Sequence, residues 1–246
     1  MERHAGAPPV LAVTGLRTEA RIAAGPRIHA LSGCGDAAGL RQRIQAAAGK
    51  VSAIISFGVA GGLAKGVAPG TKLVARTIIA QDGARYTADP LWSNRLLAAG
   101  QASFADIAGI DLPVAGVAER HALHLKTGAL AADTESHVAA KVAAAYGLPF
   151  AAFRVVADPA HRQLPHAALV AIRPDGSLAF GAILGSLARD PRQVPQLLGT
   201  ANDARAAFYA LFRCRKLLGS GLGFCDFREF LLDMPAEDVI GGTLAV

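Results

Sequence analysis

Short apolar runs that alternate with helical segments are the feature that most restricts how this chain can fold. Residues 10–14, 27–31 and 51–57 have the length and composition of buried strands. Helical signals separate these runs, and the longer helix, over residues 36–48, begins at the capping residue Asp36. Strands that alternate with helices form βαβ units, so the sequence predicts an α/β protein with a largely parallel sheet.

The rest of the chain extends this pattern. Further strands are expected at residues 72–80, 112–118, 129–132 and 150–157, the last of which is strongly apolar. Helices are expected to begin at Asp89-Pro90 and to cover residues 135–146, 193–198 and 202–218. Residues 159–175 contain three prolines and are predicted to be irregular. No linker or repeat divides the chain, so we predict one domain over residues 1–246.

The composition supports a large core and argues against a membrane-spanning or secreted protein. Apolar residues make up 52% of the 246 residues and aromatic residues only 6%, so the core must be largely aliphatic. The longest uncharged stretch, residues 51–64, is shorter than the roughly 18 residues of a membrane-spanning helix. The N-terminus lacks the apolar core of a signal peptide, and the cysteines at 34, 214 and 225 favour reduced thiols. We therefore expect a cytoplasmic protein.

The basic excess does not by itself select a partner. The net charge is +6, from 25 Lys and Arg against 19 Asp and Glu. Such an excess is compatible with nucleic acid, an anionic membrane surface or a phosphate-bearing substrate. An arginine-rich composition also follows from a GC-rich genome, so the function has to be read from individual motifs.

Two glycine-rich segments follow predicted strands. Ser32-Gly33-Cys34-Gly35 follows the second strand, and Gly58-Val59-Ala60-Gly61-Gly62 follows the third. Their spacing fits neither a dinucleotide fingerprint nor a P-loop, and either segment alone could be a tight strand-to-helix turn. Glycines also let backbone N–H groups approach an anion or a sugar, and loops at the carboxyl ends of neighbouring strands share one crevice. Together the two loops therefore indicate an anion or ribose site.

Two further positions place carboxylates where chemistry is expected. Asp133-Thr134-Glu135 lies between a short strand and a helix, where Glu135 could accept hydrogen bonds from a ribose diol or merely cap the helix. Asp158 ends the most apolar strand. Burial there would raise the pKa of its carboxyl and let it protonate a leaving base, although Asp before proline is also a common turn residue.

Taken in order, these motifs resemble the purine and uridine phosphorylase superfamily, which includes 5′-methylthioadenosine/S-adenosylhomocysteine nucleosidase. The resemblance covers about residues 10–160 and also includes an early glutamate, Glu19, after the first strand. It implies a phosphorylase/hydrolase-like three-layer αβα sandwich with a mostly parallel, mixed central sheet. It also implies a homo-oligomer, an adenine nucleoside as substrate, and no metal or organic cofactor, with phosphate as the candidate co-substrate.

The resemblance assigns roles to individual residues. Gly58, Ala60 and Gly61 match the loop that lines the nucleophile and the ribose. Glu135 matches the glutamate that binds the 2′- and 3′-hydroxyls, and Asp158 matches the aspartate that assists departure of the purine at N7. Glu19 corresponds to the glutamate that activates water in the nucleosidases.

Two departures from the superfamily pattern affect substrate binding. Thr134 stands where the superfamily has a Met under the ribose, and Val59 stands where a Ser or Thr often contacts phosphate. If phosphate is the nucleophile, Arg17 and the backbone amides of Gly33, Gly35 and Gly58 are the candidates to hold it. If water is the nucleophile, Glu19 is the candidate base.

Within the superfamily, the local motifs are most similar to those of the hopanoid-associated phosphorylases. The cues are Gly15-Leu16, Phe57 before the second glycine loop, and Thr127-Gly128-Ala129 shortly before Asp133. This branch implies release of adenine from adenosylhopane in hopanoid biosynthesis. A basic, amphipathic helix over residues 202–218 is compatible with peripheral contact with a membrane, although its apolar face could equally pack on the core.

Three alternatives remain open at this stage. A nucleosidase acting on 5′-methylthioadenosine or S-adenosylhomocysteine would differ in its nucleophile and its 5′ pocket. A non-catalytic nucleoside-binding protein would keep the fold and lose the reaction. A dinucleotide-dependent oxidoreductase is disfavoured by the glycine spacing. No motif indicates nucleic acid as a partner.

Overall fold

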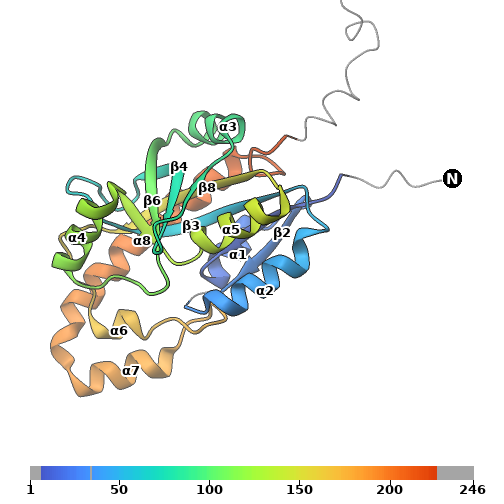
Figure 1. The fold of residues 1–246 in the computed structure, drawn as a ribbon. Helices are drawn as coiled ribbons and strands as arrows, with labels where there is room; N and C mark the ends of the chain where they lie inside the picture. The colour runs from blue at the N-terminus through green and yellow to red at the C-terminus, as the bar shows by residue number, and fades with distance from the viewer. Residues whose placement is uncertain (1–6, 34, 226–246) are drawn as a thin grey trace, which may run out of the picture.

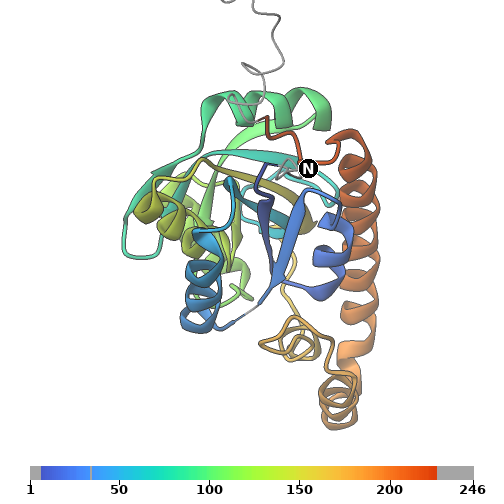
Figure 2. The same ribbon diagram turned by 90° about the vertical axis from the view of Figure 1, so that its right-hand side faces the viewer.

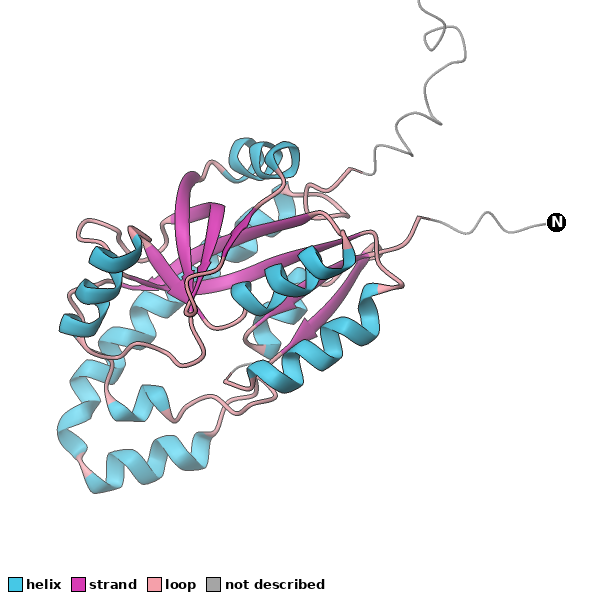
Figure 3. Ribbon diagram, in the orientation of Figure 1, coloured by secondary structure: helices cyan, strands magenta, loops and turns pink. Residues whose placement is uncertain are grey.

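The computed structural model describes residues 7–33 and 35–225, so the predictions that rest on the first six residues and on Cys34 lie outside the described part. A central sheet is covered by helices on both faces (Figures 1 and 3). Its strands are β1 (Val10–Thr14), β2 (Ile28–Ser32), β3 (Ala53–Gly62), β4 (Lys72–Ala80), β5 (Arg85–Thr87), β6 (Ser103–Gly109), β7 (Ala131–Asp133) and β8 (Phe150–Asp158). The helices are α1 (Arg17–Ala23), α2 (Ala37–Ala48), α3 (Pro90–Gly100), α4 (Val117–Thr127), α5 (Ser136–Tyr146), α6 (His166–Leu169), α7 (Phe180–Arg189) and α8 (Val194–Leu217), with a 3-10 turn, η1 (Pro191–Gln193), before α8.

The sheet is mixed and partly closes on itself. β1 lies between β2 and β3 and is parallel to both, as the βαβ pattern predicts. β3 is long enough to pair with β8 along most of its length and with β7 at its end. Because β7 pairs with β6, β6 with β4, and β4 with β8, five strands form a closed ring. The predicted fold class is confirmed, and the ring brings the carboxyl ends of β3 and β8 together.

Two apolar layers lie on the two faces of the sheet. Alternate residues of each central strand point into one layer or the other, so these strands are buried on both faces. Ile55 and Phe153 face the layer covered by α1, α3 and α8, whereas Ile54 and Ala152 face the layer covered by α2 and α5. Figure 2 shows α8 along one side of the sheet and α2 and α5 along the other. The core is largely aliphatic, in keeping with the composition.

Several predicted elements differ from the structure. Residues 112–116 form a loop rather than a strand, and α4 begins at Val117 because the Glu119 side chain accepts a hydrogen bond from the Gly116 N–H (3.2 Å) and caps the helix. β6 was not predicted, because Asp106 interrupts its apolar pattern. In the structure the Asp106 side chain forms an ion pair with Arg85 (3.3 Å). The irregular segment contains the short α6, and α7 follows it unpredicted.

The two predicted C-terminal helices are one helix, α8. Pro195 falls in its first turn, where a missing N–H costs little, and Gly199 does not interrupt it. The apolar face of α8 packs on the sheet: Ala207 and Leu211 are fully buried, and Phe208 contacts the same core. This face is therefore not a surface that could meet a membrane. Within the described residues, no helix has the length and hydropathy needed to cross a bilayer.

Candidate active site

A cavity of about 400 Å³ opens at the carboxyl ends of β1, β3 and β8. Its polar side chains come from six residues, Glu19, Arg120, Asp133, Thr134, Glu135 and Asp158. The remaining walls are mostly apolar and come from β3, from the loop before α4 and from the segment around α6. A concave apolar site with a few converging polar groups is typical of a small-molecule pocket.

Glu19 fastens α1 to the glycine-rich end of β3. Its carboxylate accepts hydrogen bonds from the backbone N–H groups of Leu16 and Val59, both at 2.7 Å. Burial raises the pKa of Glu19, while the charge of Arg154 and the backbone hydrogen bonds act in the opposite direction. A Cβ at Gly58 would lie 2.6 Å from the Glu19 Oε1, so only glycine leaves room for the carboxylate there. Glu19 is therefore a fixed carboxylate at the cavity wall.

Arg154 is the centre of a buried charge cluster that the sequence analysis did not assign. It lies within β8, and its side chain has no exposed surface. Its guanidinium donates to Ser56 Oγ (2.5 Å) and lies 3.0 Å from the Asp133 Oδ2 and 3.3 Å from the Glu135 Oε2. An arginine inside the most apolar strand of the chain was the available signal, because a charge is buried only when it is paired.

Asp133 and Glu135 divide the two roles that the sequence left open. The Asp133 Oδ1 accepts hydrogen bonds from the backbone N–H groups of Glu135 (2.9 Å) and Ser136 (2.6 Å), and so caps α5. The Glu135 side chain makes no capping hydrogen bond and lines the cavity instead. It accepts from the Thr134 hydroxyl and from Arg154. The Glu135 carboxylate is thus available for a ligand with hydroxyl groups.

The surroundings of Glu135 raise its pKa to about 8. Burial is the main cause, the charge of Arg154 opposes it, and the charges of Asp133 and Glu19 raise the pKa further. One guanidinium faces three carboxylates, so retention of a proton by one carboxylate relieves the excess negative charge. The pKa of Glu19 is raised as well, so this proton belongs to the group of buried carboxylates around Arg154.

Asp158 forms an ion pair with Arg120, a second arginine that the sequence analysis did not assign. Arg120 lies on α4, is 2% exposed, and donates to the carbonyls of Val114 (3.0 Å), Gly62 (3.3 Å) and Pro159 (3.4 Å). Burial raises the pKa of Asp158, and the charge of Arg120 lowers it. Arg120 therefore ties α4 to the ends of β3 and β8 and fixes the Asp158 carboxyl at the cavity.

Seven of the predicted site residues line this one cavity. They are Glu19, Gly35, Ala60, Gly61, Thr134, Glu135 and Asp158. A bulge between Ala60 and Gly61 shifts the pairing so that Gly61 lies opposite Asp158. The resemblance thus named residues at or after the ends of five strands, β1, β2, β3, β7 and β8, that the fold brings together.

Three predicted phosphate-binding residues are not among the lining residues. The Gly33 N–H donates to the Thr14 carbonyl (2.9 Å), and Gly58 lies behind Glu19. Arg17 pairs with Asp175 (2.6 Å), and its side chain is 55% exposed. Within the described residues, no group of three or more His, Cys, Asp or Glu side chains is arranged to hold a metal ion.

The fold has known counterparts. An S-adenosylhomocysteine nucleosidase from Streptococcus pyogenes, solved with 5-methylthiotubericidin, has a TM-score of 0.55 and 18% identity, over 64% of this chain and 86% of that one. A 5′-methylthioadenosine/S-adenosylhomocysteine nucleosidase from Helicobacter pylori, solved with butyl-thio-DADMe-Immucillin-A, has a TM-score of 0.59 and 14% identity, over 86% and 99%. Futalosine hydrolase from the same organism has a TM-score of 0.57 and 14% identity, over 85% and 97%.

The sequence itself matches a family model. No curated protein matched the chain. The model of the phosphorylase superfamily matches residues 2–189, which include every residue of the cavity described above. The chain therefore belongs to the phosphorylase superfamily and is an enzyme of the nucleoside phosphorylase and nucleosidase kind.

Proposed function

We propose that the chain hydrolyses the N-glycosidic bond of an adenine nucleoside with an apolar group at its 5′ position, and that this substrate is adenosylhopane of hopanoid biosynthesis. One observation carries the proposal: Glu19, Glu135 and Asp158 line the same cavity. These are the carboxylates that the resemblance assigns to water activation, ribose binding and departure of the base.

The reaction divides among the three carboxylates. Asp158 gives a proton to the adenine as the bond between its ring nitrogen and C1′ breaks and the ribosyl group gains oxocarbenium character. Glu135 accepts hydrogen bonds from the 2′- and 3′-hydroxyls and holds the sugar in place. Water then adds to C1′ and loses a proton to Glu19. The products are adenine and the free sugar with its 5′ substituent.

The charges around the cavity favour water over phosphate as the nucleophile. Four carboxylates line the cavity, and Arg120 is the one cation among its described lining residues. Arg120 is already paired with Asp158, and Arg17 with Asp175. The Arg120 guanidinium is also committed to three backbone carbonyls, so the described lining offers no free side-chain cation to hold a phosphate dianion. Phosphorolysis is the alternative, with the Gly35 amide and the end of β3 left to hold the anion.

The apolar walls support an apolar substituent. The loop before α4 contributes Ile110, Leu112 and Val114, and the segment around α6 contributes Leu164, Leu169 and Ile172. A hydrocarbon group in contact with these side chains would gain roughly 25 cal/mol per Å² of area removed from water. 5′-Methylthioadenosine and S-adenosylhomocysteine are the alternative substrates, because nucleosidases named for them share the fold.

The proposal is tested by measuring adenine release from adenosylhopane with and without phosphate, beside 5′-methylthioadenosine. Release from adenosylhopane that does not require phosphate is the expected result. A strict requirement for phosphate would replace water by phosphate and remove Glu19 from the mechanism. Preference for 5′-methylthioadenosine would overturn the substrate, and binding without release would leave a nucleoside-binding protein. Sedimentation velocity would test the homo-oligomer that the resemblance implies.

A further inference from the structure

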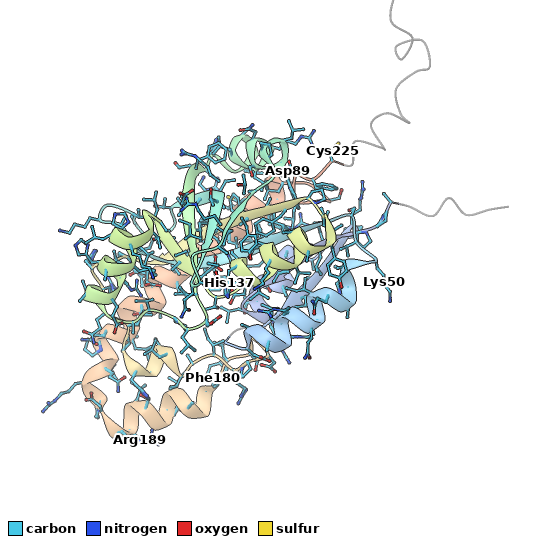
Figure 4. All side chains as sticks on the ribbon, viewed as in Figure 1. Lys50, Asp89, His137, Phe180, Arg189 and Cys225 are labelled. Carbon is cyan, nitrogen blue, oxygen red and sulfur yellow. The ribbon has the colours of Figure 1, made fainter. Side chains whose placement is uncertain are left out.

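Helix α7 has its polar and apolar residues reversed relative to a helix at a water-exposed surface. Phe180 and Leu184, one helical turn apart, are each 67% exposed. Ser186, in contrast, is 2% exposed. Figure 4 labels Phe180 and Arg189 at the two ends of this helix. A surface helix normally turns its apolar stripe inward, so this arrangement suits an apolar environment outside the molecule.

Hydrogen bonds of the buried Ser186 with His166 and Gln193 hold this reversed helix in place. Ser186 Oγ lies 3.0 Å from the His166 Nδ1, and the Gln193 side chain donates to the Ser186 carbonyl (3.3 Å). Gln193 Oε1 also accepts from the Ala167 N–H (2.8 Å). These contacts tie α6, α7 and η1 into one unit. The outward direction of Phe180 and Leu184 is therefore fixed by satisfied hydrogen bonds on the inner side.

The exposed apolar surface extends beyond α7 and reaches the cavity. Leu178, Val194 and Leu198 are also exposed, at 45%, 40% and 66%. Leu169 on α6 is 39% exposed and also lines the cavity. Figures 1 and 2 show α6 and α7 projecting from the body of the molecule, on the opposite side from α3. The apolar residues thus cover a convex projection next to the cavity.

Positive charge borders this projection. Arg189 ends α7, and Arg192 lies in η1 directly after it; both are exposed. Within the described part of the chain, neither arginine has an ion-pair partner within 4.0 Å, whereas Arg17 and Arg162 do. Exposed aromatic and aliphatic side chains beside unpaired arginines are the features by which helices bind the interface of an anionic bilayer.

We propose that the projection formed by α6, α7 and the start of α8 docks on an anionic lipid surface, with Phe180 and Leu184 inserted between the lipid chains. A convex projection suits a bilayer better than a flat contact with a second copy, and the two exposed arginines, Arg189 and Arg192, match anionic headgroups. The sequence analysis considered the apolar face of α8 for membrane contact, but that face packs on the core. The projection is the surface that we propose in its place. One consequence rests on the proposed function: the cavity would open beside the membrane, where a lipid-linked nucleoside resides.

The test is co-sedimentation of the full chain with vesicles, without substrate. We use vesicles of phosphatidylcholine alone and of phosphatidylcholine mixed with phosphatidylglycerol, and expect stronger binding to the mixture. The double variant Phe180→Ser, Leu184→Ser should lose roughly tenfold or more in partitioning. Leu91→Ser, a matched change of a 60% exposed leucine on α3, should bind like the parent.

Replacing Arg189 and Arg192 by Gln should weaken binding to the mixed vesicles by about fivefold per arginine, and Arg95→Gln on α3 is the matched control.

Three results would overturn the proposal. The parent chain could fail to bind either vesicle, or the double variant could bind as well as the parent. Alternatively, the parent could form a dimer that the double variant dissociates, with no binding to vesicles, which would make this surface an interface between two copies. As a control for folding, adenine release from a soluble nucleoside is measured on all variants. We expect it to be unchanged, because none of these residues lines the cavity. A failure of the proposed function would appear as absent adenine release with vesicle binding intact.

Discussion

The Arg154 guanidinium lies 3.3 Å from the Glu135 Oε2 and forms the link between the structural core and the cavity. The same guanidinium contacts Asp133, which caps α5, and Ser56 on β3. One buried cation therefore fixes the start of α5, the adjacent strand and the carboxylate that we assign to ribose binding. Its position explains why Glu135 can be fully buried and still point into the cavity.

Replacing Arg154 by Met should destabilise the protein by about 3–5 kcal/mol, because it leaves buried carboxylates without their counter-charge. Arg154→Lys keeps one charge but cannot reach Ser56, Asp133 and Glu135 together, so we expect an intermediate loss. Urea unfolding measures both. Arg85→Met, which removes a surface ion pair with Asp106, is the control and should lose little. Equal losses at 154 and 85 would show that the buried cluster contributes no special stability.

The free energy of unfolding should fall as the pH rises from about 4.5 to about 8. Glu135 has a folded-state pKa of about 8 against an ordinary value of 4.5. Between these values the unfolded chain has released this proton and the folded chain still holds it, so each increase in pH favours unfolding. The contribution is present in full below the unfolded pKa and is lost as the pH passes through the folded one. Raised pKa values at Glu19 and Asp158 act in the same direction.

Glu135→Gln isolates the part of this pH dependence that comes from Glu135. The amide cannot titrate, so its unfolding free energy should decrease less between the same two pH values. The variant should also bind the ribose more weakly, since an amide offers one acceptor oxygen instead of two. Denaturant unfolding as a function of pH, together with KM on a 2′,3′-diol substrate, measures both effects. An unchanged pH slope would mean that another group carries the proton.

Gly58→Ala should reduce turnover by displacing Glu19, and the Arg154 Nη1, 2.8 Å from the added Cβ, must shift as well. The added Cβ would lie 2.6 Å from the Glu19 Oε1, so the carboxylate must move away from the site where we place the attacking water. We expect kcat to fall by roughly tenfold or more, the scale of a displaced general base. Gly49→Ala is the matched control, because a Cβ there meets nothing within 4 Å. Normal kcat in Gly58→Ala would argue against Glu19 as the base.

Much of the site could be predicted from sequence because its residues lie next to strand ends. Gly61, Glu135 and Asp158 each follow or end a buried strand, and the carboxyl ends of such strands meet. Arg120 and Arg154 could not be assigned in the same way. Asp158 lies 38 positions from Arg120, and Asp133 and Ser56 lie 21 and 98 positions from Arg154. Only the closed ring of strands and the packing of α4 bring these partners together.

The projection beside the cavity was missed for a different reason. Helix α7 does carry an apolar stripe, formed by Phe180, Ile183, Leu184 and Leu187, but its two glycines and the proline-rich segment before it argue against a helix. Its order depends on the contacts of the buried Ser186 with His166 and Gln193, which no local pattern reveals. The single long α8 was predicted as two helices separated at residues 199–201, because Gly199 is unfavourable inside a helix, but it is tolerated at this position.

Arg120 should set the pH range in which Asp158 can act. Asp158→Asn should reduce kcat by roughly 100-fold or more, the scale of a lost general acid. The charge of Arg120 lowers the pKa of Asp158, so Arg120→Gln should raise this pKa and keep the carboxyl protonated to higher pH. Because the protonated form donates to the leaving adenine, the alkaline limb of kcat/KM should move to higher pH. Arg120→Lys retains the charge and should leave the limb near its original position. An alkaline limb that stays in place in Arg120→Gln, or that persists unchanged in Asp158→Asn, would assign the titration to another group and remove Asp158 as the proton donor.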